Sequence, residues 1–423
     1  MRKTDPTGHV VHGGRTLTRG DGPAQSSARP SGEPAGRIGP DAPVRERPGR
    51  LLGVDLARGM AIFGMFAVHV GPSPANVGGL PGLLLRLAQG RSAALFATLA
   101  GLSLVLMSGR DRTHKPGREV RTRIGVRAVI LLLLGTGLTM LGTTISVIIP
   151  YYGVFFLMAL PVLGFSAAAL AVLAAVAALA GPVLTMAPMV IPGDWLDTFA
   201  SYDPINSLSG RGFIDLVLVG AFPAACWIAY VFAGMALARL DLAAAGIRRR
   251  LVAAGVALTV TGYGGSWLAT HVFTHVQEAV DQAAAAASAA GSSFDVFDEG
   301  SPIERLLVAS PHSNSPFEII GNLGVVILAI VASIAALEAR PRLRRLAAPV
   351  IAVGTMSLTV YVAHILVIHY VDPEVYLGTP LAVLVAFIAG ATAFAVLWRR
   401  WFRRGPLEFL LHFSAIKLAR VVR

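Results

Sequence analysis

Cysteine is nearly absent from this sequence. The chain of 423 residues contains a single one, Cys226, and it lies inside a hydrophobic segment. One cysteine excludes an intrachain disulfide and any metal site built from several thiolates.

Charged residues are scarce as well. They make up 14% of the chain, against 54% hydrophobic residues, and the mean hydropathy is +0.65. This balance excludes an ordinary soluble protein. Several apolar runs reach the length of roughly 18 residues that is typical of a membrane-spanning helix. The sequence predicts an all-α, polytopic membrane bundle of about ten transmembrane helices, in the plasma membrane.

The charge that is present is mostly positive, with a net value of +12. Lysine and arginine gather beside the hydrophobic segments, in alternate loops and at both ends of the chain. Such an excess is typical of the cytoplasmic side of a membrane protein. The pattern predicts cytoplasmic N- and C-termini, and it argues against nucleic acid as a partner.

Composition divides the chain into three parts. Residues 1–50 are rich in Gly, Pro, Arg and Ser and are expected to form a disordered cytoplasmic tail. Residues 51–405 form the predicted transmembrane domain, and residues 406–423 a basic cytoplasmic tail. The expected spans are about 51–71, 81–107, 125–141, 149 onward, 165–186, 212–237, 251–270, 316–337, 348–370 and 380–398.

The first span carries three ionisable residues, Asp55, Arg58 and His69. Asp55 and Arg58 are three residues apart, so on a helix they share a face and can neutralise each other. His69 follows Asp55 by fourteen residues, roughly 21 Å along a helix axis. The span therefore has a charged pair near the cytoplasm and an imidazole near the opposite face. Ionisable groups at membrane depth are costly and indicate function.

The predicted topology brings polar residues of other spans to the same outer depth as His69. A polar chamber in the outer leaflet is the simplest account, because lipid-facing sites would leave these groups unpaired. The residues that share this depth are Arg86, Arg91, Asp215, Glu318, Asn322, Tyr361, His364 and His369.

Structural explanations stay open for several of these residues. His69 alone can be a hydrogen-bonded histidine at a helix end, Arg86 can reach lipid head groups, and Asp215 and Glu318 can lie at the membrane interface. A metal site is not predicted. His271 and His275 are four residues apart, as two ligands on one helix face would be, but no clear third ligand accompanies them.

Several stretches resemble the transmembrane acyltransferase superfamily. The stretch GVDLARGMAIFGMFAVHVG is similar to the first helix of bacterial proteins with the heparan-alpha-glucosaminide N-acetyltransferase catalytic domain and of the related YeiB-type proteins. The later matches, in the family's order, are GRSAALFATLAGLSL, LVGAFPAACWIAYVFAGMALARLDL, SPFEIIGNLGVVIL, GTMSLTVYVAHILV and GPLEFLLH.

This resemblance implies acyl transfer across the membrane. Acetyl-CoA or another acyl-CoA would bind on the cytoplasmic side, and an extracytoplasmic glycan, glycolipid or envelope component would accept the acyl group. His69 matches the family's catalytic histidine at the outer end of the first helix region. No metal is implied. The expected partners are membrane lipids, the donor and the acceptor, and a homodimer stays open.

The residues can be assigned to roles on this basis. An imidazole can act either as a general base or as a nucleophile that carries the acyl group, and the sequence leaves both open. The candidates for catalysis are His69, Asp215, Glu318 and His364; for acyl-CoA binding, Asp55, Arg58, Arg91, Arg110 and Arg123; and for stabilising the oxyanion or positioning the acceptor, Arg86, Asn322 and Tyr361.

Two other functions compete with acyl transfer. The same intramembrane His, Asp and Glu residues can form the relay of a proton-coupled transporter. A scaffold without catalysis is the third hypothesis.

Overall fold

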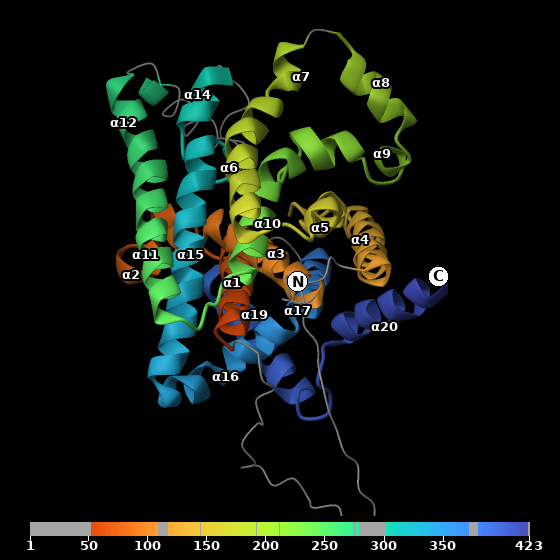
Figure 1. The fold of residues 1–423 in the computed structure, drawn as a ribbon, viewed down its shortest axis with the longest axis vertical. Coiled ribbons are helices and arrows are strands. Elements are labelled where there is room, and N and C mark those ends of the chain that lie inside the picture. The colour runs from red at the N-terminus through yellow and green to blue at the C-terminus, as the bar shows by residue number, and fades with distance from the viewer. Residues whose placement is uncertain are drawn as a thin grey trace, which may run out of the picture. The chain divides into compact units, whose positions relative to one another are not determined.

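A computed structural model describes most of the chain (Figure 1). The described residues are 52–108, 117–143, 145–191, 193–210, 212–273, 276–278, 302–371 and 380–421. The predicted N-terminal tail, residues 1–50, lies outside them.

Every regular element in these residues is a helix, so the predicted all-α class is confirmed. The elements are α1 (Leu52–Val70), η1 (Pro74–Asn76), α2 (Gly79–Ala88), α3 (Arg91–Ser108), α4 (Arg118–Thr139), α5 (Ile149–Ala159), η2 (Leu160–Val162), α6 (Ala167–Leu184), α7 (Ala187–Val190), α8 (Trp195–Tyr202), α9 (Pro204–Ser209), η3 (Asp215–Val219), α10 (Ala224–Ala238), α11 (Ala245–Thr259), η4 (Val260–Gly264), α12 (Gly265–Val272), α14 (Pro302–Leu307), α15 (Pro316–Ala339), α16 (Pro341–Thr355), α17 (Ser357–Tyr370), α19 (Pro380–Trp398) and α20 (Pro406–Val421).

Seven helical segments among the described residues are long and apolar enough to cross a bilayer, and the bent pair α16–α17 makes an eighth. Ile149–Val162 and Ala224–Ala238 are shorter apolar helices and lie where the sequence predicts the fourth and sixth spans. Each of the predicted spans thus corresponds to a helix or to a broken helix. The chain is a multi-pass membrane protein.

Three predicted spans are interrupted. The second divides into α2 and α3 at Gly90, whose φ of +68° is readily adopted only by glycine. The sixth begins with the π-helical η3 and restarts after Pro223. The ninth bends by 74° between α16 and α17, at Met356. These breaks matter because two of them lie beside the functional site.

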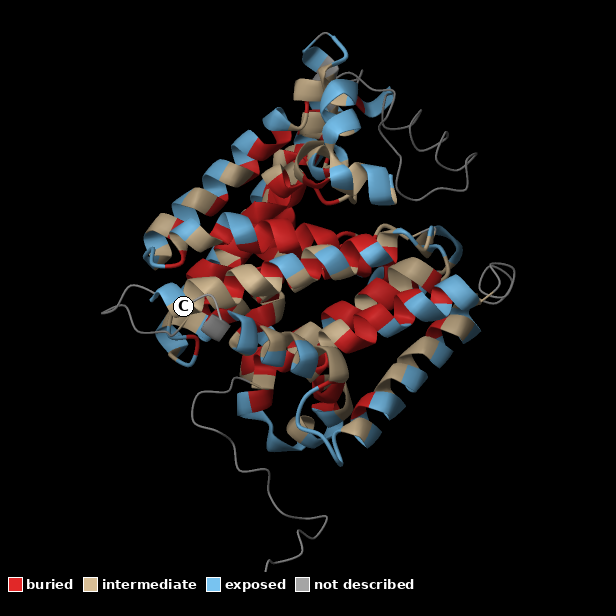
Figure 2. Cartoon of the chain, turned by 90° about the vertical axis from the view of Figure 1, so that its right-hand side faces the viewer, coloured by how far each residue is buried: buried red, intermediate tan, exposed pale blue. Residues whose placement is uncertain are grey.

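The core is built around α10, which packs against α3 and α6. Nearly every residue of α10 is buried, as expected for a helix that is apolar on all sides. Figure 2 shows buried residues on the inner faces of the helices and exposed residues on the outer faces. The outer faces are apolar too: Val172, Val176, Leu179 and Val183 form an exposed stripe along α6. Such a stripe suits contact with lipid.

The C-terminal residues predicted as a basic tail contain a helix. Helix α20 contacts α4 and α17. Its Glu408 accepts hydrogen bonds from the backbone N–H groups of Leu358 (2.7 Å) and Thr359 (3.1 Å) at the start of α17. A carboxylate at this position caps a helix N-terminus and complements its dipole. Helix α20 therefore fixes the start of α17, which has no side-chain cap of its own from Met356.

Candidate active site

Two histidines far apart in sequence meet at the centre of the site. His69, at the end of α1, and His364, in the middle of α17, lie with Nδ1 of the first 3.0 Å from Nε2 of the second. Their rings are nearly parallel, at 6°, with centroids 5.2 Å apart. His364 is buried, with 3% of its surface exposed, and His69 is half-buried. The two imidazoles form one hydrogen-bonded unit.

The hydrogen bonds define which nitrogens carry protons. Nδ1 of His364 is bonded to the carbonyl oxygen of Tyr361. A carbonyl can only accept, so this nitrogen must be the donor, and Nε2 of a neutral His364 is then an acceptor. Nδ1 of His69 must donate to it. Nε2 of His69 is left with its lone pair, as a base or a nucleophile requires.

Tyr361 stands one turn before His364 on the same helix. Its phenol oxygen accepts a hydrogen bond from the backbone N–H of Ile148, at 3.2 Å, and its ring packs edge-on against His364 with centroids 4.7 Å apart. Because the oxygen accepts from Ile148, the phenol keeps its own proton for donation. Such a donor is suited to a developing oxyanion.

A small cavity adjoins the histidine pair. Its volume is about 20 Å³, room for about one water molecule. The first turn of α3 contributes Ser92 and Ala93 to its wall, and unpaired backbone N–H groups in a first helical turn favour negative charge nearby. The lining residues are Met65, Val68, His69, Ala88, Gly90, Ser92, Ala93, Ser146, Ile148, Phe222, His312 and Tyr361.

Glu318 holds one wall of this cavity. Its carboxylate accepts hydrogen bonds from the backbone N–H groups of His312 (2.9 Å) and Asn314 (2.8 Å), both of which have positive φ angles. The Ser315 side chain accepts in turn from the Glu318 N–H, at 3.0 Å. Glu318, a candidate for catalysis from the sequence, thus fixes the turn that carries His312.

His312 had no clear signal in the sequence. Its ring stacks on Trp227, with centroids 6.0 Å apart and planes at 19°, and it lines the cavity with His69. Burial lowers the pKa of His312 to about 4, although a hydrogen bond with the Ala221 backbone raises it. His312 is therefore neutral at physiological pH. Only the fold of the loop before α15 brings it to the site.

Asn322 lies one turn after Glu318, as its spacing predicts, and its amide donates to Glu318 at 3.2 Å. The amide also donates to the Tyr230 hydroxyl at 3.2 Å, and its oxygen accepts from the Tyr263 hydroxyl at 2.5 Å. Arg91 lies 4.7 Å from the centroid of the Tyr263 ring, a cation–π contact. Asn322 and Arg91 thus belong to a network behind the cavity wall.

The remaining residues predicted at the outer depth lie outside the cavity lining. Arg86 donates to the backbone oxygen of Pro74 at 3.3 Å. Asp215 opens the π-helical η3, and the next residue, Leu216, lines a second pocket. The fold places Arg86 and Asp215 around the site and not in it.

The predicted pair Asp55–Arg58 is present at the other end of α1. Nη1 of Arg58 lies 2.9 Å from the Asp55 carboxylate, and Nη2 donates to the Ser103 hydroxyl on α3 at 3.0 Å. Nη1 also approaches the backbone oxygen of Gly354 on α16, at 3.5 Å. The arginine therefore joins three helices at this end of the bundle.

A basic group lies where α4 meets α20. Arg123 pairs with Glu119, and Nη2 of Arg127 lies 3.3 Å from Nδ1 of His412. Burial, and then the positive charges of Arg404, Arg127 and Arg123, lower the pKa of His412. Three guanidinium groups thus lie near His412 and contribute to the shift after burial. Arg110 lies outside the described residues.

Within the described part of the chain, no group of three or more His, Cys, Asp or Glu side chains is placed to hold a metal ion.

The family model described as heparan-alpha-glucosaminide N-acetyltransferase, catalytic, matches residues 50–270, just over half of the chain. A second model, described as "Protein of unknown function (DUF418)", matches residues 306–416, in support of the YeiB-type resemblance. No curated protein matches the chain. The chain is a membrane protein of the acetyltransferase type and belongs to the family of the heparan-alpha-glucosaminide N-acetyltransferase catalytic domain.

Proposed function

We propose that this protein transfers an acetyl or other acyl group from a cytoplasmic acyl-CoA to an extracytoplasmic glycan, glycolipid or envelope acceptor in the plasma membrane. The observation that carries the proposal is the bond between His69 and His364, at 3.0 Å. This bond leaves Nε2 of His69 with a lone pair beside the cavity, so one imidazole is ready to react and the other supports it.

The proposed reaction balances without a further reactant. The acceptor oxygen or nitrogen attacks the thioester carbonyl carbon, and the bond from carbon to sulfur breaks as the new acyl bond forms. Nε2 of His69 takes the proton of the acceptor and passes it to the departing CoA thiolate. While His69 holds this proton it is positively charged, and the hydrogen bond from its Nδ1–H to Nε2 of His364 stabilises that charge.

A covalent route uses the same atoms. Nε2 of His69 would attack the thioester first and hold the acyl group until the acceptor takes it. In both routes the Tyr361 hydroxyl donates to the carbonyl oxygen as negative charge develops there. Glu318 acts through His312, whose turn it holds.

The donor phosphates are proposed to bind at the basic group of Arg123, Arg127 and Arg404. Guanidinium groups match phosphate oxygens in geometry and charge. Asp55 and Arg58 bond to each other, and Arg58 bonds to the neighbouring helix α3. We therefore assign them a structural role at the cytoplasmic entrance for the donor. The cavity of about 20 Å³ is too small for an acyl arm, so donor binding requires its walls to open.

Inverted native membrane vesicles provide the test, since they expose the cytoplasmic face and contain the natural acceptor. Acetyl-CoA labelled in its acetyl group is added outside. We expect release of CoA and transfer of label to material inside the vesicle, protected from added hydrolases. Uptake of a solute that follows a proton gradient, with no dependence on acetyl-CoA, would instead identify a transporter.

A further inference from the structure

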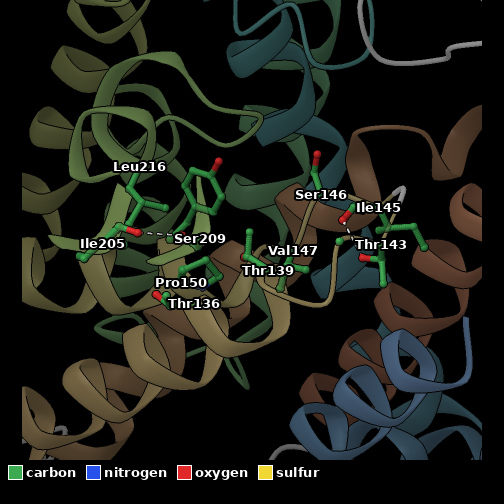
Figure 3. A pocket seen from close by; sticks show the side chains of 12 residues that line it. Thr136, Thr139, Thr143, Ile145, Ser146, Val147, Pro150, Ile205, Ser209 and Leu216 are labelled. Atoms are coloured by element: carbon green, nitrogen blue, oxygen red, sulfur yellow. Dashed lines mark hydrogen bonds between the residues drawn. The ribbon is translucent and has the colours of Figure 1, made fainter. Parts of the chain in front are cut away.

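A second, larger pocket adjoins the histidine cavity. Its volume is about 250 Å³, equal to about eight waters at liquid density. Figure 3 shows its labelled side chains, which come from α4, the segment before α5, the start of α5, α9 and η3. The described residues that line it are Thr136, Thr139, Gly142, Thr143, Ile145, Ser146, Val147, Pro150, Tyr151, Ile205, Ser209 and Leu216.

The two cavities share a wall. Ser146 lines both of them. Phe222 lines the histidine cavity and packs edge-on against Tyr151 of the larger pocket, with ring centroids 5.4 Å apart. The histidine cavity holds about one water, so an acceptor must approach it from a neighbouring space. The larger pocket is such a space, directly beside it.

The lining of the larger pocket combines hydroxyl groups with apolar surface. The hydroxyls of Thr139 and Ser209 donate to the backbone oxygens of Gly135 and Ile205, each at 3.0 Å. A hydroxyl that donates its proton still has lone pairs, so these groups present acceptors to a ligand. None of the described lining residues is charged. A ligand with an ionic group would therefore bury a charge without a partner here, at a high cost in free energy. An uncharged ligand avoids this cost.

We propose that this pocket binds the acceptor and that the acceptor is an uncharged, hydroxyl-rich carbohydrate group, so that the reaction is O-acylation. Sugar hydroxyls donate to the Thr and Ser oxygens, while the C–H faces of the ring lie against Pro150, Ile205 and Leu216. One sugar hydroxyl faces the wall at Ser146, gives its proton to Nε2 of His69 and attacks the thioester carbonyl carbon, from which the CoA thiolate leaves. This inference rests on the proposed acyl transfer and adds the class of acceptor.

The test uses the full chain in detergent with acetyl-CoA and three matched probes. Methyl glucoside is neutral, glucosamine carries an amine, and glucuronate carries a carboxylate. CoA release and acetylation of each sugar are measured. We expect kcat/KM for methyl glucoside to exceed that of the other two by about tenfold or more, since each of those must bury a charge.

A pair of threonine variants on α4 adds a second readout. Thr139→Val removes one pocket hydroxyl without changing the shape of the side chain, and should raise the KM for methyl glucoside about three- to tenfold. Thr122→Val is the control, because Thr122 bonds the carbonyl of Arg118 at 3.0 Å in the same way but lies near the other end of the helix. Its KM should stay at the wild-type value.

Three results would overturn the proposal: preference for glucosamine or glucuronate, equal KM values for the two threonine variants, or CoA release with membrane extract but with none of the three sugars. If no probe and no membrane extract gives CoA release that depends on His69, the proposed acyl transfer itself falls, and this inference with it.

Discussion

Replacing His69 by glutamine should lower kcat for acyl transfer by about 10²- to 10⁴-fold, the usual contribution of a general base. Glutamine has a similar size and can still donate to Nε2 of His364, so the helix end should keep its place. It offers no basic nitrogen to the acceptor. The rate of CoA release from acetyl-CoA, per amount of folded protein, measures the effect.

His271→Gln provides the matched control. His271 also lies near the end of a helix, α12, where its Nδ1 is bonded to the backbone oxygen of Trp267 at 2.8 Å, and it is exposed. This variant should transfer the acyl group at the wild-type rate. The kcat of His364→Gln should fall between those of the two other variants, because a neutral amide replaces the imidazole that accepts the His69 proton, while Nε2 of His69 stays in place. Wild-type activity in His69→Gln would contradict the assigned role.

Replacing Gly234 by alanine should disrupt the packing of the core. A Cβ atom at this position would lie 1.8 Å from the backbone oxygen of Thr98, on the facing helix α3. The crossing is reciprocal, since a Cβ atom at Gly101 would lie 2.0 Å from the backbone oxygen of Val231 on α10. Backbone atoms cannot rotate away, so the two helices must separate. We expect a loss of about 3 kcal/mol or more in the free energy of unfolding.

Gly390→Ala is the control for this prediction. Gly390 lies inside α19, and a Cβ atom there would meet nothing within 4 Å. Alanine favours a helix over glycine by about 1 kcal/mol, so this variant should melt at or slightly above the wild-type temperature. Thermal unfolding in detergent, followed by loss of the monodisperse peak, compares the two. Equal melting of both variants would show that the α3–α10 crossing tolerates a side chain.

The sequence predicts the helices well because long apolar runs are a strong signal. The ion pair of Asp55 with Arg58 was also predictable, since spacing along one helix decides which side chains share a face. The same reasoning correctly places Glu318 beside Asn322. Two of the three interrupted spans have a residue at the break that a sequence can show, Gly90 in the second span and Pro223 in the sixth. The bend of the ninth span at Met356 has no such residue at its position.

The site was only partly predictable, because its contacts depend on how helices rotate about their axes. The topology brings His69 and His364 to similar depth, but depth alone does not decide whether two side chains meet. His312 reaches the cavity through a loop with two positive φ angles, which no periodicity reveals. Glu408 acts from α20 on α17, across 49 residues, a contact that only the folded chain defines.

The central claim is that the thioester reacts at the pair His69–His364. A structure of the full chain with a non-hydrolysable thioether analogue of acetyl-CoA tests it most directly. The account predicts the carbonyl of the analogue within hydrogen-bond reach of the Tyr361 hydroxyl, with its carbon about 3–3.5 Å from Nε2 of His69. An analogue bound with its acyl end near Asp55 and Arg58, and with the cavity at His69 unchanged, would contradict it.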